Sequence, residues 1–126
     1  MKIIGLGTDI AEVERIAALL ARHGDRFRTR ICTDAELDSA RSRETQATFF
    51  AGRWAAKEAA AKALGCGIGK SCSFTDIIIT NDAAGRPELR FAGSAAAYAA
   101  RIGVQSISIS ISHENRYAVA TVILCG

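Results

Sequence analysis

Residues 45–64 read TQATFFAGRWAAKEAAAKAL, and Gly65 follows them directly. Alanine, lysine, glutamate and leucine dominate this stretch, and these residue types favour the helical conformation. Glycine directly after such a run is typical of a helix end, because it adopts a left-handed backbone conformation without a steric penalty. The stretch therefore predicts one long helix, against which the rest of the chain has to pack.

The N-terminal segment KIIGLGTD, residues 2–9, predicts a strand with glycine on one face. Gly5 and Gly7 alternate with larger residues, which suits a strand that another backbone approaches closely. Residues 9–20 then carry apolar side chains at helical spacing, and Gly24 ends that pattern. We therefore expect a helix to follow the strand from Asp9 onward.

Shorter elements complete the expected fold. Thr33 and Glu36 have the spacing of a capping box and predict a helix to about Ser42. Serine and isoleucine alternate before His113, which predicts a half-buried strand whose small serines pack against helices. The remaining predicted elements are strands at 76–80 and 88–91 joined by a turn, a helix at 94–102, and strands at 106–113 and 117–124. Helices packed on antiparallel strands form an α+β fold, which we expect to be a single domain spanning residues 1–126.

The composition predicts a cytoplasmic protein that binds neither nucleic acid nor membrane. The chain of 126 residues is 49% hydrophobic and 23% charged, which is typical of a globular domain. Its formal net charge is only +3 and aromatic residues make up 6%, so the basic patches and stacking side chains of a nucleic-acid binder are not indicated. No apolar run is long enough to span a bilayer. We expect no signal peptide, and four free cysteine thiols. A chain this small often builds its active site between subunits.

Arginines gather around the end of the first predicted helix. Arg15, Arg22 and Arg26 are spaced by seven and four residues, which keeps them near one helical side if the helix continues past Gly24. Such a basic surface favours an acidic protein partner. A solvated basic face without a partner is the alternative.

Charged residues also follow a regular spacing on the long helix. Trp54, Glu58 and Lys62 lie four residues apart and share one side, and Arg53 and Lys57 share the next. From this spacing alone, a solvated face of ion pairs is favoured over a functional site.

The exit from this helix, GCGIGKS at residues 65–71, is rich in glycine. Glycine lets backbone amides approach a phosphate without obstruction by side chains. The loop is not a Walker motif, because that motif lies between a strand and a following helix. On its own, the loop is weak evidence for a phosphate site, and a structural turn is the favoured interpretation.

Three stretches of the sequence resemble the holo-acyl-carrier-protein synthase family. They are GLGTDI at 5–10, FAGRWAAKEAAAKALGCGIG at 50–69 and SISISISHENRYAVATVIL at 106–124. The resemblance runs over nearly the whole chain in the expected order. It implies a 4′-phosphopantetheinyl transferase-like fold, in which an antiparallel sheet packs against a long central helix and shorter helices. It also implies a Mg²⁺-dependent enzyme of fatty acid biosynthesis, which transfers 4′-phosphopantetheine from coenzyme A to a serine of apo-acyl carrier protein and releases adenosine 3′,5′-bisphosphate.

The resemblance assigns the catalytic roles to Asp9, Glu58 and Lys62. Asp9 and Glu58 are implied to hold Mg²⁺ against the pyrophosphate of coenzyme A, and two carboxylates with phosphate oxygens suit this ion. Lys62, one helical turn beyond Glu58, is implied to contact the phosphates. Either Glu58 or a metal-bound water takes the serine proton.

The resemblance also assigns residues that bind the two substrates. Gly65, Gly67, Ile68 and Lys62 are implied to bind coenzyme A, and Arg53 and His113 to reach its 3′-phosphate from the neighbouring subunit of a homotrimer. For His113, a structural hydrogen bond at a strand end is the alternative. The basic residues implied to receive the acyl carrier protein are Arg15, Arg22 and Arg26.

Two departures from the family pattern and two other functions remain to be considered. Trp54 stands where phenylalanine is common, and Cys66 stands where threonine is common, which makes the site a candidate for oxidation.

A coenzyme A- or nucleotide-binding module without transferase activity would explain the glycine loop. It would not need Asp9 and Glu58, which repel phosphates when no metal is bound. An RNA-binding domain would need aromatic residues on its sheet.

Overall fold

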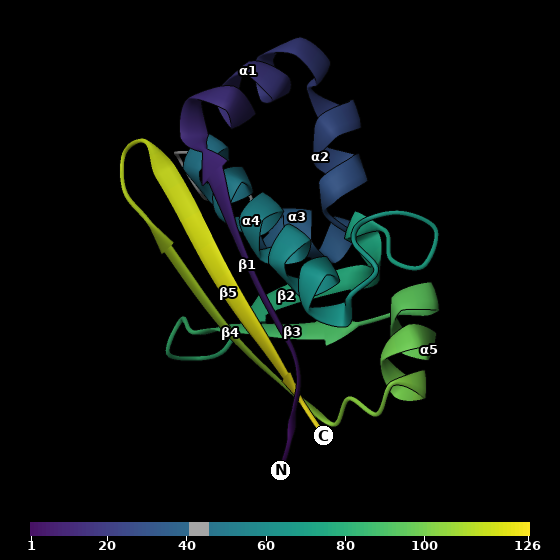
Figure 1. The fold of residues 1–126 in the computed structure, drawn as a ribbon. Coiled ribbons are helices and arrows are strands. Elements are labelled where there is room, and N and C mark those ends of the chain that lie inside the picture. The colour runs from purple at the N-terminus through teal and green to yellow at the C-terminus, as the bar shows by residue number, and fades with distance from the viewer. Residues whose placement is uncertain (41–45) are drawn as a thin grey trace.

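The computed structural model describes residues 1–40 and 46–126 and has an α+β architecture, as the sequence predicts (Figure 1). One antiparallel sheet has the strand order β1-β5-β4, and a second sheet consists of β2 and β3 alone. The strands are β1 (Ile3–Glu12), β2 (Ile77–Asn81), β3 (Pro87–Phe91), β4 (Ser106–His113) and β5 (Tyr117–Cys125). The helices are α1 (Val13–His23), α2 (Asp25–Ile31), α3 (Asp34–Ala40), α4 (Gln46–Leu64) and α5 (Gly93–Arg101), with a 3-10 turn η1 (Phe74–Asp76).

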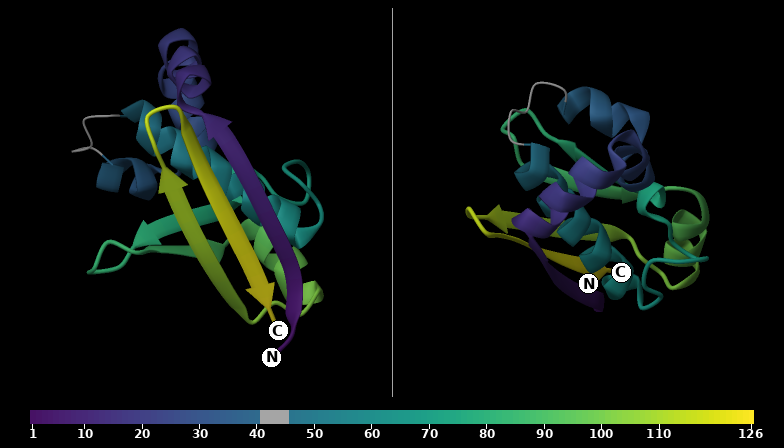
Figure 2. Two further views of the ribbon diagram at one scale, coloured as in Figure 1. Left: turned by 60° about the vertical axis from the view of Figure 1, so that its left-hand side comes forward. Right: turned by 90° about the horizontal axis from the view of Figure 1, so that it is seen from above.

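The predicted long helix is α4, and it lies at the centre of the molecule. Figure 2 shows α4 crossing one face of the three-stranded sheet, with α1 and α2 beyond the end of β1. The hairpin of β2 and β3 contacts both β4 and α4. Seven alanines of α4 are buried between these layers: Ala51, Ala55, Ala56, Ala59, Ala60, Ala61 and Ala63. Short side chains on nearly every side allow neighbouring elements to approach the helix backbone.

The closest approach is between β1 and α4, where the two glycines of the N-terminal strand face the helix. A Cβ atom at Gly5 would lie 1.9 Å from the carbonyl oxygen of Ala63, and one at Gly7 would lie 1.8 Å from that of Ala59. Any side chain at these positions would overlap the helix backbone. The predicted close backbone approach is therefore confirmed, and we call these four residues the β1–α4 seam.

Three details of the fold differ from the sequence predictions. The helix expected from Asp9 begins only at Val13, because residues 9–12 continue β1 and pair with β5 as far as Glu12 opposite Tyr117. Residues 25–31 form the unpredicted helix α2. The alternating serines of β4 are exposed rather than packed on helices, because the isoleucines occupy the inner face.

Other predicted features are confirmed or lie outside the described residues. Thr33 and Glu36 form the predicted capping box, in which the Thr33 amide donates to Glu36 Oε1 at 2.9 Å and the Glu36 amide donates to Thr33 Oγ1 at 3.3 Å. The hairpin of β2 and β3, the helix α5 and the strand β5 all form near the expected positions. The predicted end of the α3 helix at Ser42 and the predicted start of α4 at Thr45 lie outside the described residues.

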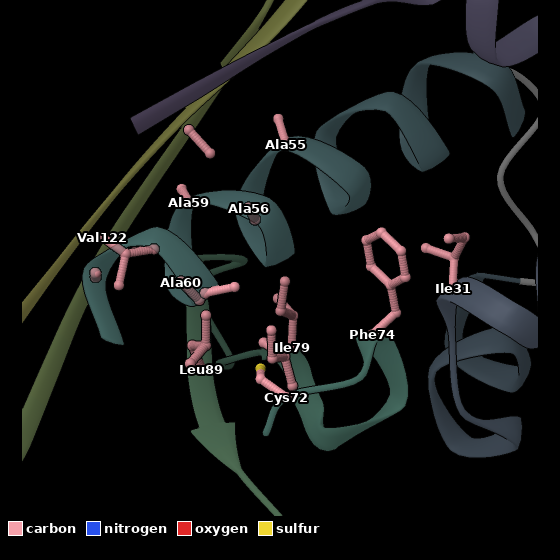
Figure 3. Packing of buried hydrophobic residues seen from close by; sticks show 14 of the residues in the cluster. Ile31, Ala55, Ala56, Ala59, Ala60, Cys72, Phe74, Ile79, Leu89 and Val122 are labelled. Atoms are coloured by element: carbon pink, nitrogen blue, oxygen red, sulfur yellow. The ribbon is translucent and has the colours of Figure 1, made fainter. Parts of the chain in front are cut away.

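The core fills the space between α4, the sheets and the 3-10 turn. Figure 3 shows Ala56 and Ala60 of α4 above Ile79. Phe74 of η1 and Ile31 of α2 pack farther along the same helix. The two chain ends lie side by side, where the Lys2 and Gly126 backbones exchange two hydrogen bonds of 2.8 Å. Among residues 1–40 and 46–126, no helix combines the length and apolar character needed to cross a membrane.

Candidate active site

The strand β1 brings Asp9 to α4, where it meets the two charged residues singled out on that helix. Lys62 Nζ lies 2.8 Å from Asp9 Oδ1 and also donates to the backbone carbonyl of Thr8 at 3.1 Å. The Lys62 side chain is 50% exposed and that of Asp9 is 17% exposed, so the pair borders solvent. The hydrogen bond to Asp9 raises the pKa of Lys62, which keeps its ammonium group charged. We call Asp9, Glu58 and Lys62 the acidic corner.

Glu58 completes this corner, and its surroundings disfavour the charged form of its carboxylate. Partial burial raises its pKa, and the negative charge of Asp9 raises it further, while the cations of Lys62 and Arg15 oppose these effects. Two carboxylates thus repel each other at one place, which a divalent cation would relieve. Within the described residues there is no cluster of three or more His, Cys, Asp or Glu side chains for a metal. Two carboxylates nevertheless fit Mg²⁺, which takes few protein ligands and accepts phosphate oxygens and water.

The glycine-rich loop leaves α4 next to this corner. Gly65 and Gly67 have positive φ angles of 88° and 67°, and their amides both donate to the carbonyl of Ala61, at 3.2 and 3.1 Å. These glycine amides are therefore used in ending the helix. Within the described residues, the amides of Cys66 and Ile68 have no backbone acceptor. The amides of Cys66 and Ile68, between the glycines, are therefore among the loop amides suited to a phosphate.

Arg53 and His113 meet in a separate pocket. The pocket holds about 150 Å³ and is lined by Thr48, Phe49, Gly52, Arg53, Asn81, Ile111 and His113. Arg53 is only 8% exposed, donates to Asn81 Oδ1 at 2.9 Å and lies over the Phe49 ring at 4.7 Å. Asn81 in turn donates to the carbonyl of Gly85 at 2.9 Å, which ties the pocket to the β2–β3 turn. Sequence reasoning missed Asn81, although it begins the predicted turn NDAAGRP.

The acidic corner and this pocket lie on different sides of α4. Arg53 and Glu58 are five residues apart, whereas one helical turn takes 3.6 residues, so the two side chains point in directions roughly 140° apart. Each side of the helix is completed by a different strand, β1 at the corner and β4 at the pocket. One chain therefore presents two half-sites that do not face each other.

The three predicted partner-binding arginines occupy two helices rather than one. Arg15 and Arg22 lie on α1 and Arg26 on α2, because Gly24, with φ 54°, separates the helices. All three residues are exposed, and the guanidinium of Arg15 lies 5.8 Å from the centre of the Trp54 ring. Beside them is a hollow of about 290 Å³ lined by Leu19, His23, Arg26, Phe27, Arg30, Ile31 and Trp54. We call Arg15, Arg22 and Arg26 the arginine arm.

Comparison with known proteins decides the family. The model of the 4′-phosphopantetheinyl transferase superfamily matches residues 5–122. A holo-[acyl-carrier-protein] synthase of Vibrio cholerae is 50% identical over 122 residues, which cover 97% of either chain. The chain belongs to the 4′-phosphopantetheinyl transferase superfamily.

Solved structures of other phosphopantetheinyl transferases have the same fold. The holo-[acyl-carrier-protein] synthase of Neisseria meningitidis matches with a TM-score of 0.92 at 36% identity, covering 98% of this chain and 99% of that one. A holo-(acyl-carrier-protein) synthase of Bacillus anthracis, solved in complex with CoA (3′,5′-ADP), matches with a TM-score of 0.83 at 40% identity, covering 98% and 97%. The fold implied by the sequence resemblance is confirmed.

In this phosphopantetheinyl transferase, the residue before Glu58 is a buried lysine. Lys57 is completely buried, and its ammonium group donates to Glu36 Oε1 at 2.8 Å, to the Ile31 carbonyl at 2.6 Å and to the Phe74 carbonyl at 3.1 Å. The other oxygen of Glu36 accepts from the amide of Ile79 at 3.1 Å. The solvated ion-pair face favoured by spacing alone is therefore wrong for Lys57. This ion pair instead joins α4 to α2, α3, η1 and β2.

Proposed function

We propose that this member of the superfamily transfers the 4′-phosphopantetheine group of coenzyme A to a serine hydroxyl of an apo-acyl carrier protein. The acidic corner beside the glycine-rich loop carries this proposal. It combines two carboxylates for a cation, a lysine for phosphate charge and backbone donors for phosphate oxygens within one end of α4. The Vibrio cholerae relative bears the name of this activity, and the Bacillus anthracis relative was solved with CoA (3′,5′-ADP).

In the proposed reaction the serine oxygen bonds to the β-phosphorus of coenzyme A, and the bond from that phosphorus to the bridging oxygen breaks. Adenosine 3′,5′-bisphosphate leaves with the bridging oxygen and its electron pair. Phosphoryl-group transfer depends on positioning and on stabilising the negative charge of both phosphates. Lys62 supplies a fixed positive charge for the leaving phosphate. Glu58 has a raised pKa, which suits it to accept the serine proton.

Asp9 and Glu58 would hold Mg²⁺ in this reaction. Bound there, the ion would neutralise charge on the pyrophosphate oxygens. The mutual repulsion of the two carboxylates supports this assignment, because it raises the pKa of Glu58 unless a positive charge lies between them. A module that only binds coenzyme A would gain nothing from this pair.

We also propose that the active enzyme is a homotrimer whose sites lie between subunits. The separation of the two half-sites on α4 supports this, since Arg53 and His113 of one subunit can complete the acidic corner of another. The outer face of the three-stranded sheet exposes large apolar side chains, with Leu6 at 64%, Ile10 at 63% and Val119 at 40% exposure. Apolar groups gathered on one face are typical of an interaction surface.

The arginine arm is the proposed docking site for the carrier protein. Its exposed guanidinium groups suit an acidic partner, and the adjacent hollow offers apolar surface from Phe27 and Trp54. Arg15 links this surface to the acidic corner, because its positive charge partly opposes the rise that burial and Asp9 cause in the pKa of Glu58. We place the reaction in the cytoplasm, where the four thiols would stay reduced.

One experiment tests the activity directly. The protein is incubated with coenzyme A, Mg²⁺ and an apo-acyl carrier protein, and the carrier is weighed by mass spectrometry. A gain of one phosphopantetheine group per carrier, which disappears when the carrier serine is replaced by alanine, is expected. If coenzyme A binds but the mass of the carrier stays unchanged, the chain is a binding module and the proposal fails.

A further inference from the structure

One wall of the pocket that contains Arg53 and His113 is formed by Asn81, the last residue of β2. The side-chain oxygen of Asn81 accepts a hydrogen bond of 2.9 Å from Nη2 of Arg53. Arg53 is largely buried, whereas Asn81 is exposed. The bond therefore joins a buried cation of α4 to the surface of the β2–β3 hairpin.

The side-chain amide of Asn81 is fixed in one orientation by its two partners. A guanidinium group only donates hydrogen bonds, so it requires the oxygen of the amide. The nitrogen of the same amide donates to the backbone carbonyl of Gly85 at 2.9 Å, and a carbonyl only accepts. Rotating the amide by half a turn would place two donors opposite each other at one end and two acceptors at the other. Arg53 and Gly85 thus hold the amide from both ends.

The β2–β3 turn in its turn holds the carbonyl of Gly85. The carboxylate of Asp82 accepts from the amides of Ala84 and Arg86, each at 2.9 Å, and the Gly85 amide donates to the Asp82 carbonyl at 2.9 Å. Gly85 has a φ angle of 86°, a conformation that glycine adopts without a steric penalty. The turn is therefore a well-defined support, from which Asn81 reaches Arg53.

A second contact holds the guanidinium group of Arg53 from another direction. Its central carbon lies 4.7 Å from the centre of the Phe49 ring, a distance at which cation and ring attract each other. An arginine side chain loses considerable rotational freedom when it is ordered. Contacts that order it in advance therefore improve the binding of a ligand. Asn81 and Phe49 both contribute to this ordering of Arg53.

The ligand that suits this pocket carries a phosphate group. A guanidinium matches the geometry of phosphate oxygens, and His113 lines the same pocket. Coenzyme A carries a pyrophosphate and a separate phosphate at the 3′ position of its ribose. In the proposed reaction the acidic corner and the glycine-rich loop bind the pyrophosphate, which leaves the 3′-phosphate for the pocket.

We propose that Asn81 is a positioning residue that orients Arg53 toward the 3′-phosphate of coenzyme A. Through Arg53 it strengthens the preference of the enzyme for coenzyme A over 3′-dephospho-coenzyme A. The inference rests on the proposed function, since that function supplies the ligand. A neutral amide suits this role, because a carboxylate in its place would pair with Arg53 and compete with the phosphate for the positive charge.

The test measures how the full-length protein binds coenzyme A and 3′-dephospho-coenzyme A, by isothermal titration calorimetry. We expect Asn81→Ala to raise the Kd for coenzyme A about ten-fold, which corresponds to one hydrogen bond to a charged group, and to change the Kd for 3′-dephospho-coenzyme A by less than about two-fold. In transfer assays the KM for coenzyme A should rise with little change in kcat. Gln105→Ala removes an exposed amide at the opposite end of β4 from His113 and is the matched control, expected to bind both ligands like the parent.

Asn81→Asp separates positioning from a merely structural tether. It keeps an oxygen for Arg53 and adds a negative charge, so an ion pair would still join the hairpin to α4. We expect it to bind coenzyme A no better than Asn81→Ala does and to bind 3′-dephospho-coenzyme A like the parent, which also shows that the variant is folded. Parent-like affinity of Asn81→Asp for coenzyme A would instead identify a structural tether and overturn the inference.

Three other results would also overturn it: parent-like binding of coenzyme A by Asn81→Ala, an equal loss for both ligands, or a parent protein that does not distinguish them. Failure of the proposed function is a separate result. A parent protein that prefers coenzyme A but adds no mass to the carrier protein would refute the transfer activity, while the ratio of the two Kd values would still decide the role of Asn81.

Discussion

The two sides of α4 are built in opposite ways. Toward β1, the β1–α4 seam brings backbone against backbone, with glycine facing alanine and no space for a further atom. Toward α1 and α2, the helix presents Trp54, which stacks on Phe27 at 6.0 Å and lies 4.9 Å from the Phe74 ring. Beyond these rings lies the exposed arginine arm.

This difference matches the two tasks of the proposed reaction. Asp9 follows Gly7 by two residues and Glu58 precedes Ala59, so the seam fixes the distance between the two carboxylates proposed to handle phosphate. The carrier protein has to arrive and leave, and the surface proposed for it is exposed and consists of long side chains. In the proposed reaction, tight backbone packing supports the chemistry, and a more adaptable surface supports recognition of the carrier protein.

Gly7→Val should have the largest effect, because it breaks the seam. A Cβ atom there would overlap the carbonyl of Ala59, so β1 and α4 would have to separate. We expect a loss of more than about 4 kcal/mol in the free energy of unfolding, measured by urea denaturation. Gly69→Ala is the control, since a Cβ atom at Gly69 meets nothing within 4 Å and should change stability by less than about 0.5 kcal/mol. Equal stability of Gly7→Val and the parent would show that the seam is not rigid.

Asp9→Asn should leave the β1–α4 seam intact and greatly reduce the rate of transfer. The amide keeps the shape of the carboxylate but not its charge for a cation or for Lys62. We expect the transfer rate to fall about a hundred-fold to a thousand-fold, comparable to losing one electrostatic contact to a transition state. Glu88→Gln, an exposed carboxylate on β3, should keep the parent rate. An Asp9→Asn enzyme with the parent rate would refute the role of the acidic corner.

Lys57→Met tests the buried ion pair that joins α4 to α2, α3, η1 and β2. It leaves the buried Glu36 carboxylate without its cation, which should destabilise the fold by about 3 kcal/mol or more in thermal or urea unfolding. Lys70→Met is the matched control, because Lys70 is exposed and should be nearly neutral for stability. Equal unfolding of both variants would mean that the buried ion pair contributes nothing to the fold.

Arg15→Glu combined with Arg22→Glu should have the smallest effect, and mainly on recognition of the carrier protein. Reversing two exposed charges should raise the KM for the carrier protein about ten-fold to a hundred-fold, while the KM for coenzyme A and the stability stay near their parent values. Arg90→Glu on β3 provides a control with an exposed arginine far from the arm. Matching increases in both KM values would indicate damage to the acidic corner instead.

Local sequence patterns predicted most of the fold. The alanine-rich helix, the capping box of Thr33 and Glu36, and the close approach at Gly5 and Gly7 each depend on a few neighbouring residues, and the structure contains all three. The extension of β1 to Glu12 was missed, because it depends on pairing with Tyr117 at the other end of the chain. Alternation in β4 predicted a strand but gave the wrong environment for its serines.

The candidate site was predictable only in part. The motif residues Asp9, Glu58 and Lys62 come together, as do Arg53 and His113 in their pocket. The buried ion pair was not predictable, because Lys57 and Glu36 are 21 residues apart on separate helices and their spacing on the sequence has no periodic signature. Asn81 likewise acquires its role only when the β2–β3 hairpin folds against α4.

The placement of Arg53 and Glu58 on different sides of one helix has a genetic consequence in the proposed trimer. Two genes, one encoding a chain without a working acidic corner and the other a chain without Arg53, would each produce inactive protein. Expressed together they would form mixed assemblies, in which some interfaces pair an intact corner from one chain with an intact pocket from the other. Activity would then reappear in the cell from two defective alleles, because the unit of function is the interface between chains.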